Sequence, residues 1–110
     1  RKSNCVVKQV NILNTNEKMR KDFLREIETV KNLRPHPNVC IMLGVCTDPQ
    51  YPICIVMEFV EGGNLQDLIY DGKIKVTPQV IAQLGQDITA GMSHLHQENI
   101  LHCDLACRNL

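Results

Sequence analysis

The sequence contains no tryptophan and only two tyrosines and two phenylalanines among its 110 residues. Proteins that bind single-stranded nucleic acids stack bases on aromatic side chains, so this scarcity argues against a base-stacking surface. Twelve basic and twelve acidic residues leave no formal net charge, and no overall field therefore draws the chain to nucleic acid or to an anionic membrane. We expect no nucleic-acid partner.

The sequence also has no apolar run of about twenty residues, the length that a membrane span needs, and it does not open with a signal peptide. Membrane attachment is thus not visible in this segment. Six cysteines are present, but Cys40, Cys46 and Cys54 lie inside apolar runs, where cysteine behaves as a small hydrophobic residue. We expect an intracellular chain with reduced thiols, forming at most one modest domain.

The first third of the sequence predicts a strand followed by a helix. Residues 5–10 are β-branched and apolar apart from Lys8 and Gln9, which is typical of a strand. Asn14, with Glu17 three residues later, is placed to cap a helix that runs from residue 18 to about 33. One face of that helix is apolar, with residues at helical spacing: Met19, Phe23, Ile27, Val30 and Leu33.

Glu26 falls in the middle of this apolar face. A carboxylate that points into a core needs a cationic partner, because burying it unpaired costs several kcal/mol. The nearest element in the sequence is the strand that carries Lys8, which could supply that partner. The alternative is that Glu26 lies at the edge of the apolar face and reaches water, and periodicity alone leaves both open.

Two apolar runs, residues 39–46 and 53–60, follow the helix and are joined by a turn with two prolines. We expect them to pair as antiparallel strands with one face under the preceding helix. Glu61-Gly62-Gly63 then takes the chain out of the sheet, either as a flexible connector between two lobes or as an ordinary loop.

The remaining sequence is mainly helical. Asn64 is placed to cap a short helix, and Thr77-Pro78 to start the longest helix, which we expect to end near Gln97. Gly85 and Gly91 weaken this helix locally and allow close packing against it.

The last nine residues, HCDLACRNL, bring an imidazole, a carboxylate, a guanidinium and a carboxamide together in one short stretch. Asp104 and Asn109 can face one pocket, where the first accepts a proton and the second holds a hard cation. Taken alone, the same two residues are more simply explained as turn formers, so the rest of the sequence has to decide. A metal site built on His102, Cys103 and Cys107 is a weaker alternative, because a structural zinc site needs a fourth ligand.

The order of these features resembles a eukaryotic protein kinase over nearly all 110 residues. The lysine strand, the helix glutamate and the catalytic loop of that family correspond to CVVK, FLRE and HCDLACRN, with HPNV and VMEFVEGGNL between them. The resemblance implies an α+β, partial two-lobed protein-kinase-like fold. Residues 1–60 would be part of the small lobe, residues 61–63 the hinge exit, and residues 64–110 the start of the large lobe.

The same resemblance implies that ATP and Mg²⁺ are the cofactors and that a protein is the substrate. Lys8 would hold the α- and β-phosphates and pair with Glu26. Val6 would lie above the adenine, Met57 at the back of the adenine pocket, and the backbone of Glu58 and Val60 along the adenine edge. All of these residues lie within residues 1–60, the predicted part of the small lobe, and Val60 is the last residue of that part.

In the catalytic loop, the resemblance implies that Asp104 accepts or orients the proton of the substrate hydroxyl and that Asn109 binds a magnesium ion. Arg108, four positions after the aspartate, would take the place of the lysine that most serine/threonine kinases carry two positions after it. His102, with Val30 and Met42, would belong to the internal packing column that joins the lobes.

The DLACRN sequence is similar to the DLAARN of tyrosine kinases, which favours tyrosine as the acceptor. HPNVCIMLGVC and the glycine exit equally resemble the tyrosine-kinase-like group of serine/threonine kinases. The family implies a cytoplasmic location, as a soluble enzyme or as the intracellular part of a receptor.

Three departures from the family pattern bear on activity. Cys103 replaces the arginine that binds a phosphorylated activation loop in this family, so we expect loop phosphorylation to control the complete protein weakly or through other contacts. The same replacement keeps a pseudokinase or scaffold as the rival function. Val6 replaces a small alanine. No G-x-G-x-x-G precedes Lys8 and no D-F-G follows Asn109, so we expect an incomplete kinase sequence that does not catalyse by itself.

Overall fold

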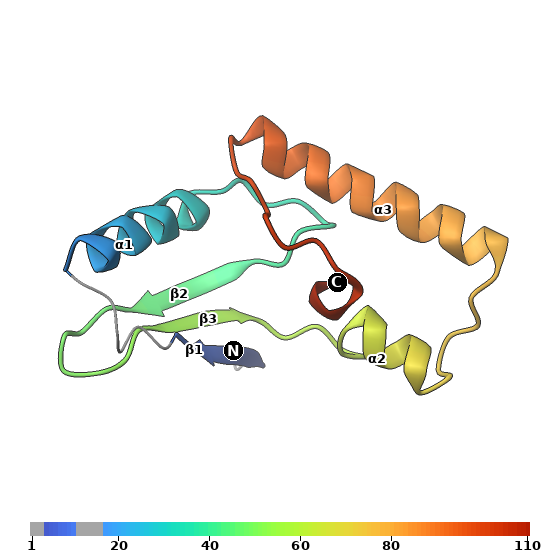
Figure 1. The fold of residues 1–110 in the computed structure, drawn as a ribbon, viewed down its shortest axis with the longest axis horizontal. Coiled ribbons are helices and arrows are strands. Elements are labelled where there is room, and N and C mark those ends of the chain that lie inside the picture. The colour runs from blue at the N-terminus through green and yellow to red at the C-terminus, as the bar shows by residue number, and fades with distance from the viewer. Residues whose placement is uncertain (1–3, 11–16) are drawn as a thin grey trace. The chain divides into compact units, whose positions relative to one another are not determined.

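The computed structural model describes residues 4–10 and 17–110 and has an α+β fold, as predicted. The elements, in chain order, are β1 (Cys5–Gln9), α1 (Glu17–Lys31), β2 (Met42–Cys46), β3 (Cys54–Glu58), α2 (Leu65–Tyr70), α3 (Pro78–Gln97) and the single 3₁₀ turn η1 (Cys107–Asn109) (Figure 1). Contacts divide the chain into two compact units. The first unit comprises residues 1–35 and 40–59, and the second comprises residues 36–39 and 60–110.

The first unit is built on a three-stranded antiparallel sheet with the order β1-β3-β2. The predicted antiparallel pairing of the two apolar runs is confirmed, with Val45 opposite Ile55. A β-bulge lies between Met42 and Gly44. Strand β2 begins at Met42, three residues later than the apolar run suggested, because Val39 donates its N–H to the carbonyl of His36 in a turn that belongs to the second unit.

Side chains alternate between the two faces of this sheet. Val6 and Lys8 share a face with their cross-strand partners Met57 and Ile55. Ile53, the residue before β3, lies on this same face by the alternation and is fully buried. We call this side the inner face of the sheet, and the side that carries Cys46 and Cys54 the outer face.

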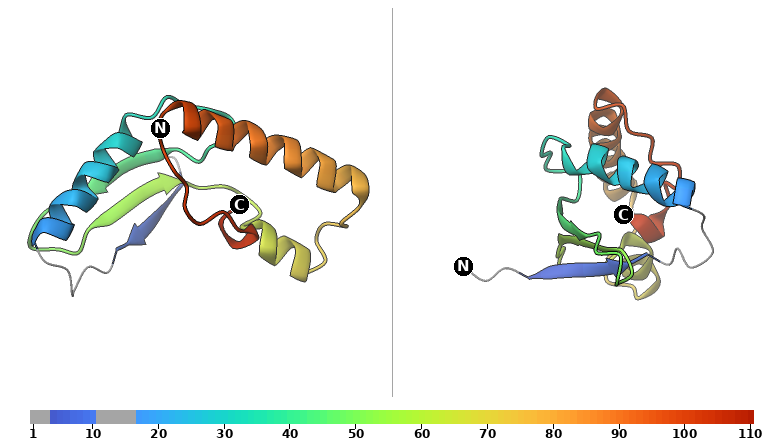
Figure 2. Two further views of the ribbon diagram at one scale, coloured as in Figure 1. Left: turned by 45° about the horizontal axis from the view of Figure 1, so that its top comes forward. Right: turned by 90° about the vertical axis from the view of Figure 1, so that its left-hand side faces the viewer.

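Helix α1 lies alongside strand β2 (Figure 2). Its apolar stripe is only partly buried: Ile27 is 5% exposed, whereas Met19 at the start of the stripe is 54% exposed. The helix spans Glu17–Lys31, against a prediction of residue 18 to about 33, so the prediction is confirmed within two residues at each end. Its predicted cap, Asn14, lies outside the described residues.

The second unit contains helices α2 and α3, and the structure confirms both predicted N-caps. The Asn64 side chain accepts a hydrogen bond from the Asp67 N–H at 2.9 Å, and the Thr77 hydroxyl accepts one from the Val80 N–H at 3.2 Å. Such caps satisfy backbone N–H groups that the first helical turn leaves without partners. Before α2, Gly62 and Gly63 adopt φ values of 93° and 79°, which only glycine adopts without strain.

A short segment, residues 36–39, packs on α3 within the second unit. The Asn38 side chain donates a hydrogen bond of 2.9 Å to the backbone carbonyl of Asp87, and the His36 ring stacks on His94 with centroids 4.8 Å apart. A Cβ atom on Gly91 would lie 2.7 Å from the Asn38 carbonyl oxygen. The close packing predicted for Gly91 is therefore confirmed, whereas a Cβ on Gly85 would meet no described atom within 4 Å.

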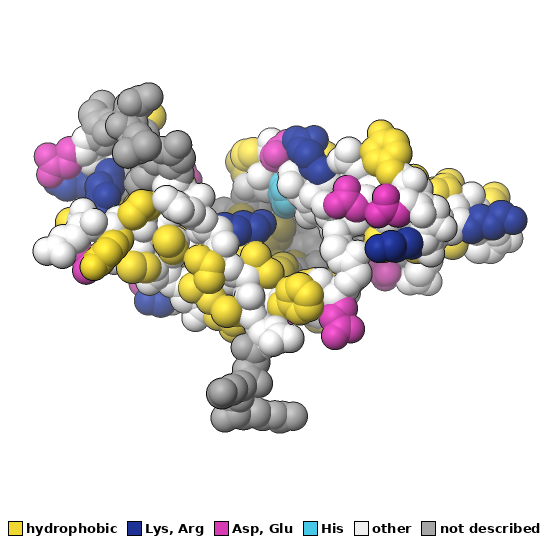
Figure 3. Space-filling model, turned by 90° about the horizontal axis from the view of Figure 1, so that it is seen from below, with side chains coloured by type: hydrophobic (Ala, Val, Ile, Leu, Met, Phe, Trp, Pro, Cys, Tyr) yellow, Lys and Arg dark blue, Asp and Glu magenta, His cyan; other side chains and the backbone are white. Residues whose placement is uncertain are grey.

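Large hydrophobic side chains are frequent at the surface, as Figure 3 shows for one face. Within the described part of the chain, the buried hydrophobic residues are Ile27, Ile53 and Leu65. Each unit therefore has a small core. In the same part of the chain, no helix combines the length and the apolar character that crossing a bilayer requires.

Candidate active site

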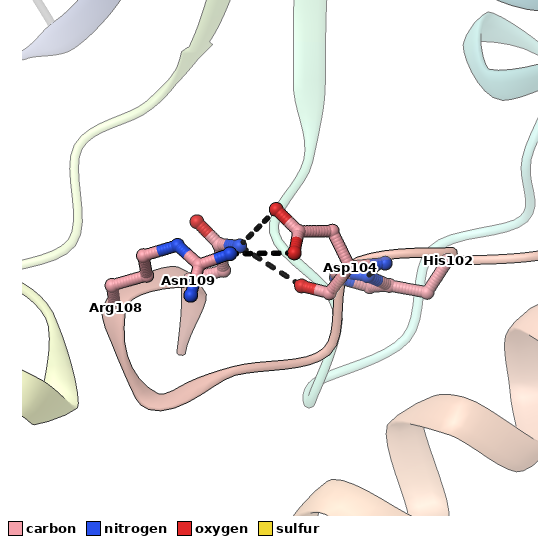
Figure 4. Close-up of polar contacts among 4 residues, drawn as sticks. All are labelled: His102, Asp104, Arg108 and Asn109. Atoms are coloured by element: carbon pink, nitrogen blue, oxygen red, sulfur yellow. Dashed lines mark hydrogen bonds and ion pairs between the residues drawn. The ribbon is translucent and has the colours of Figure 1, made fainter.

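The loop that follows α3 holds the acidic and amide side chains that the sequence singled out. Asn109 donates from its amide nitrogen to both the backbone carbonyl and the carboxylate of Asp104, at 2.9 and 3.1 Å (Figure 4). The structure thus brings Asp104 and Asn109 into contact, and the turn η1 achieves this by bending the chain after Ala106. The two residues thus form a turn, as one of the two alternatives stated, whereas their joint use as a proton acceptor and a cation ligand stays a prediction.

Arg108 binds the other oxygen of the same carboxylate, with its guanidinium 2.6 Å from Asp104 Oδ1. Both side chains are more than half exposed, at 56% for Arg108 and 63% for Asp104. A pair this open to solvent contributes at most about 1 kcal/mol to stability. Its main effect is to fix the orientation of the carboxylate, which Asn109 grips from the other side.

The backbone on the other side of Asp104 is held by His102. The Asp104 N–H donates to the ring nitrogen Nδ1 of His102 at 3.2 Å, across Cys103. Cys103 adopts a φ of 64°, in the left-handed region, which costs a non-glycine residue on the order of 1 kcal/mol. Its thiol is exposed. The strained turn at Cys103 therefore positions Asp104, while the packing role predicted for His102, Val30 and Met42 stays a prediction.

The loop is anchored to helix α2, which lies beside η1 in Figure 1. The N–H of Leu65, the first residue of α2, donates to the carbonyl of Leu110 at 2.8 Å. The Leu65 side chain is buried, so this anchor belongs to the core of the second unit. The carboxylate of Asp104 consequently stands on a turn that is fixed at its C-terminal end.

The donor atoms at this turn suit a hard cation. Both hydrogen bonds of Asn109 to Asp104 use its amide nitrogen, so its side-chain carbonyl oxygen remains a possible ligand beside a carboxylate. Carboxylate and carbonyl oxygens are the ligands that Mg²⁺ prefers. The residues thus fit the magnesium ion that the resemblance implied. Across the described residues, no group of three or more His, Cys, Asp or Glu side chains is arranged to hold a metal, so the alternative site at His102, Cys103 and Cys107 is not formed.

The nucleotide-binding residues predicted for the first unit gather on the inner face of the sheet. Val6 and Met57 stand directly opposite each other on β1 and β3, and both are half-buried. Lys8 follows two residues after Val6 on the same face and is exposed. The register therefore creates a small apolar platform with an ammonium group beside it.

The Lys8–Glu26 ion pair is not made in this structure. Both side chains are exposed, and no ion pair joins them among the residues that the structure describes. Glu26 thus follows the second of the two alternatives, in which it reaches water at the edge of the apolar stripe. Its pairing with Lys8 stays a prediction.

Glu58 has contacts that the sequence analysis did not foresee. Its N–H donates to the carbonyl of Ile41, its carboxylate accepts from the Ile41 N–H, both at 3.0 Å, and its own carbonyl accepts a weak 3.8 Å bond from the Cys40 thiol. The backbone N–H of Glu58 is therefore occupied and its carbonyl already accepts one weak bond, so the predicted contact of its backbone with an adenine edge stays a prediction. An acidic residue inside an apolar run needs a partner, and that rule could have indicated such contacts.

The thiol of Cys40 is affected by this arrangement. Partial burial, together with the negative charge of Glu58 and a hydrogen bond to it, raises the pKa of Cys40 above its ordinary value, and the nearby Lys8 opposes this weakly. Val60, the other residue predicted at the adenine edge, is 55% exposed, and its role there stays a prediction.

Comparisons with known proteins show which sequences this chain is similar to. The family model described as protein tyrosine and serine/threonine kinase matches residues 1–110. The chain is 39% identical, over its whole length, to the probable serine/threonine-protein kinase drkB of Dictyostelium discoideum, of which it covers 16%. It is 36% identical over 80% of its length to the dual specificity protein kinase pyk3 of the same organism, of which it covers 6%. It is also 38% identical over 84% of its length to the serine/threonine-protein kinase STY46 of Arabidopsis thaliana, of which it covers 16%. The chain therefore spans less than a fifth of the length of these relatives.

Proposed function

We propose, since this chain belongs to the protein tyrosine and serine/threonine kinase family, that the complete protein transfers the γ-phosphoryl group of ATP to a hydroxyl group of a protein. The observation that carries the proposal is the carboxylate of Asp104, which Arg108 and Asn109 hold from two sides while it stays open to solvent. A group that must reach the hydroxyl of an incoming protein has to be both oriented and accessible.

In this mechanism, Asp104 accepts or orients the proton of the substrate hydroxyl as the oxygen attacks the γ-phosphorus. Arg108 and Asn109 keep the carboxylate in one orientation, so little reorganisation is needed when the substrate arrives. When bound, Mg²⁺ would neutralise the phosphate charge, and the side-chain oxygen of Asn109 would be the ligand that this turn supplies.

The inner face of the sheet would bind the nucleotide. Val6 and Met57 offer apolar contact to the adenine ring, and the Lys8 ammonium carries the positive charge that the α- and β-phosphates require. The carbonyl of Glu58 and the backbone of Val60 accept and donate hydrogen bonds along the adenine edge. In the nucleotide-bound protein, Glu26 pairs with Lys8 and orients it.

Asp104→Asn in the complete protein tests this proposal. The substitution keeps the size of the side chain and removes the charge that attracts the proton, so phosphoryl transfer from radiolabelled ATP should fall by about 100-fold or more. Asp22→Asn, on an exposed position of α1, is the matched control and should leave the rate unchanged. Equal rates in the two variants would refute the role of Asp104.

Phosphoryl transfer to a protein, measured in parallel with nucleotide binding, separates the enzyme from the pseudokinase or scaffold. An active enzyme should bind ATP and transfer phosphate to a protein. A complete protein that binds ATP, or fails to bind it, and transfers no phosphate to any protein acceptor would be a pseudokinase.

For the acceptor, the names of the drkB and STY46 relatives support serine and threonine, which we take as the first candidate for the present protein, whereas the name of pyk3 is compatible with either class. Tyrosine is the second candidate, supported by the DLACRN sequence and by the contact of Arg108 with Asp104. Phosphoamino-acid analysis of products from a substrate mixture would decide between them. Phosphotyrosine alone would exclude the first candidate, and its absence would exclude the second.

A further inference from the structure

Two thiols face each other across the sheet of the first unit. Cys46, on β2, and Cys54, on β3, are direct partners in the antiparallel register, and all six cysteines, each in the described part of the chain, are free. We propose that Cys46 and Cys54 form a reversible dithiol modification site, which a peroxide converts to a cross-strand disulfide. This site depends only on the register of the first unit and is independent of the proposed phosphoryl transfer.

The backbone register defines which kind of pair this is. Val10 donates its N–H to the carbonyl of Ile53, so the N–H and C=O groups of Ile53 point toward β1. The N–H and C=O groups of the next residue, Cys54, therefore point the other way, toward β2. Cys46 and Cys54 are therefore a hydrogen-bonded pair, for which the Cα atoms lie about 5.5 Å apart. Disulfides join Cα atoms that are roughly 4.4 to 6.8 Å apart, so this pair falls inside the permitted range.

The side chains also point the same way, since directly opposite residues of a ladder share a face. Opposite Cβ atoms are about 4.5 to 5.5 Å apart, whereas a disulfide needs roughly 3.5 to 4.5 Å. The ladder must tighten slightly, and it can do so here because Cys46 is the last residue of β2 and Cys54 the first of β3. A bond formed under such strain is easily reduced, which makes the modification reversible.

The register selects this pair among the cysteines that lie on the strands of the first unit, Cys5, Cys46 and Cys54. On its other side Cys54 faces Gln9, and Cys5 is opposite Glu58 at the far end of β3. Cys46 is exposed, whereas Cys54 is half-buried and donates from its thiol to the carbonyl of Pro52 at 3.5 Å. Cys46 is therefore the thiol that the oxidant meets first, and Cys54 the one that resolves the product.

The reaction with hydrogen peroxide balances in two steps. The Cys46 thiolate attacks one peroxide oxygen, so that an S–O bond forms, the O–O bond breaks and hydroxide leaves as water after protonation. The Cys54 thiolate then attacks the sulfenic sulfur, so that the S–S bond forms, the S–O bond breaks and a second water leaves. Overall, two thiols are oxidised to one disulfide and one peroxide is reduced to two waters.

The test uses the complete protein treated with hydrogen peroxide, followed by N-ethylmaleimide to block free thiols. An endoproteinase that cleaves before aspartate cuts at Asp48 and so separates Cys46 from Cys54, which lie in one tryptic peptide. Mass spectrometry without reductant should find the two peptides joined, with Cys40 alkylated, and dithiothreitol should release both. Cys46→Ser and Cys54→Ser should each abolish the joined species, whereas the matched control Cys5→Ser, on the same sheet, should preserve it.

A second probe requires no variant. Phenylarsine oxide, a trivalent arsenical that bridges two neighbouring thiols, should protect Cys46 and Cys54 together from N-ethylmaleimide. The proposal is overturned if peroxide joins a different pair of cysteines, if Cys46 is overoxidised without a joined peptide, or if the arsenical protects neither thiol. Each of these results leaves the proposed kinase function unaffected, because that is tested at Asp104.

Discussion

Replacing Gly91 by alanine should leave the stability of the second unit unchanged or lower it, although the same change in an open helix position is stabilising. In the middle of a helix, alanine is favoured over glycine by about 1 kcal/mol. Gly85 offers the open case, because an added Cβ would meet nothing within 4 Å among the described atoms. The two glycines lie on the same helix, α3, so they form a matched pair.

At Gly91 the added methyl group would stand 2.7 Å from the backbone carbonyl oxygen of Asn38, and 3.4 Å from its carbonyl carbon and Cβ. Ordinary contacts begin at 3.4 Å, so the segment must move by several tenths of an ångström. A backbone oxygen cannot rotate away as a flexible side chain can. The movement also disturbs the 2.9 Å bond from the Asn38 side chain to Asp87. Overpacking of this kind costs about 1 to 3 kcal/mol, which matches or exceeds the gain in helix propensity.

The assay is equilibrium unfolding in urea, followed by the circular dichroism of the helices. Gly85→Ala should raise the free energy of unfolding by up to about 1 kcal/mol. Gly91→Ala should leave it unchanged or lower it by up to about 2 kcal/mol, so the two variants should differ by about 1 to 3 kcal/mol. If Gly91→Ala proves as stable as Gly85→Ala, residues 36–39 do not pack closely on α3, and the reasoning fails.

Two further predictions concern a helix cap and a thiol. Thr77→Ala removes the hydroxyl that accepts from the Val80 N–H and should lower the free energy of unfolding by about 1 kcal/mol. Thr77→Ser keeps a hydroxyl and should retain most of the original stability. A urea titration in which the two variants unfold together would contradict the role of the cap. Because the pKa of Cys40 is raised in the folded protein, its alkylation by iodoacetamide should need a higher pH than that of the exposed Cys5, and Glu58→Gln should shift the Cys40 profile downward. The raised pKa also makes the free energy of unfolding depend on pH, because the folded protein holds the Cys40 proton more tightly than the unfolded chain does. This contribution to stability is present below the ordinary thiol pKa and is lost as the pH rises through the raised pKa. Unfolding measured across that range should show the loss, and Cys40→Ser should remove this contribution.

Features set by a few neighbouring residues could be predicted from the sequence. The caps at Asn64 and Thr77 and the glycine turn at Gly62 and Gly63 are local, because each depends on backbone groups within three residues. The contact between Asp104 and Asn109 belongs to the same class, since a single turn separates them. For these features, spacing and residue type were sufficient.

Features that depend on distant segments were missed or displaced. The apolar run suggested a strand from Val39, but this residue takes part in the turn that packs on α3, and pattern alone does not show that partner. Helical periodicity placed Glu26 inside the apolar stripe, yet only part of that stripe is covered, and the carboxylate is exposed. The pairing of β1 with β3, and the bonds from Glu58 to Ile41, likewise join residues far apart in sequence.

The strand order β1-β3-β2 also has a consequence for chain entropy. Cys46 and Cys54 are 8 positions apart in the sequence, whereas Gln9 and Cys54, which are paired just as directly, are 45 positions apart. Loop closure grows with the logarithm of length, so joining β1 to β3 costs about 1.5 kcal/mol more than closing the β2–β3 hairpin. Lys8 therefore lies on the strand whose pairing has the largest loop-closure cost, and the inner face that carries Val6, Lys8 and Met57 forms only when β1 pairs with β3.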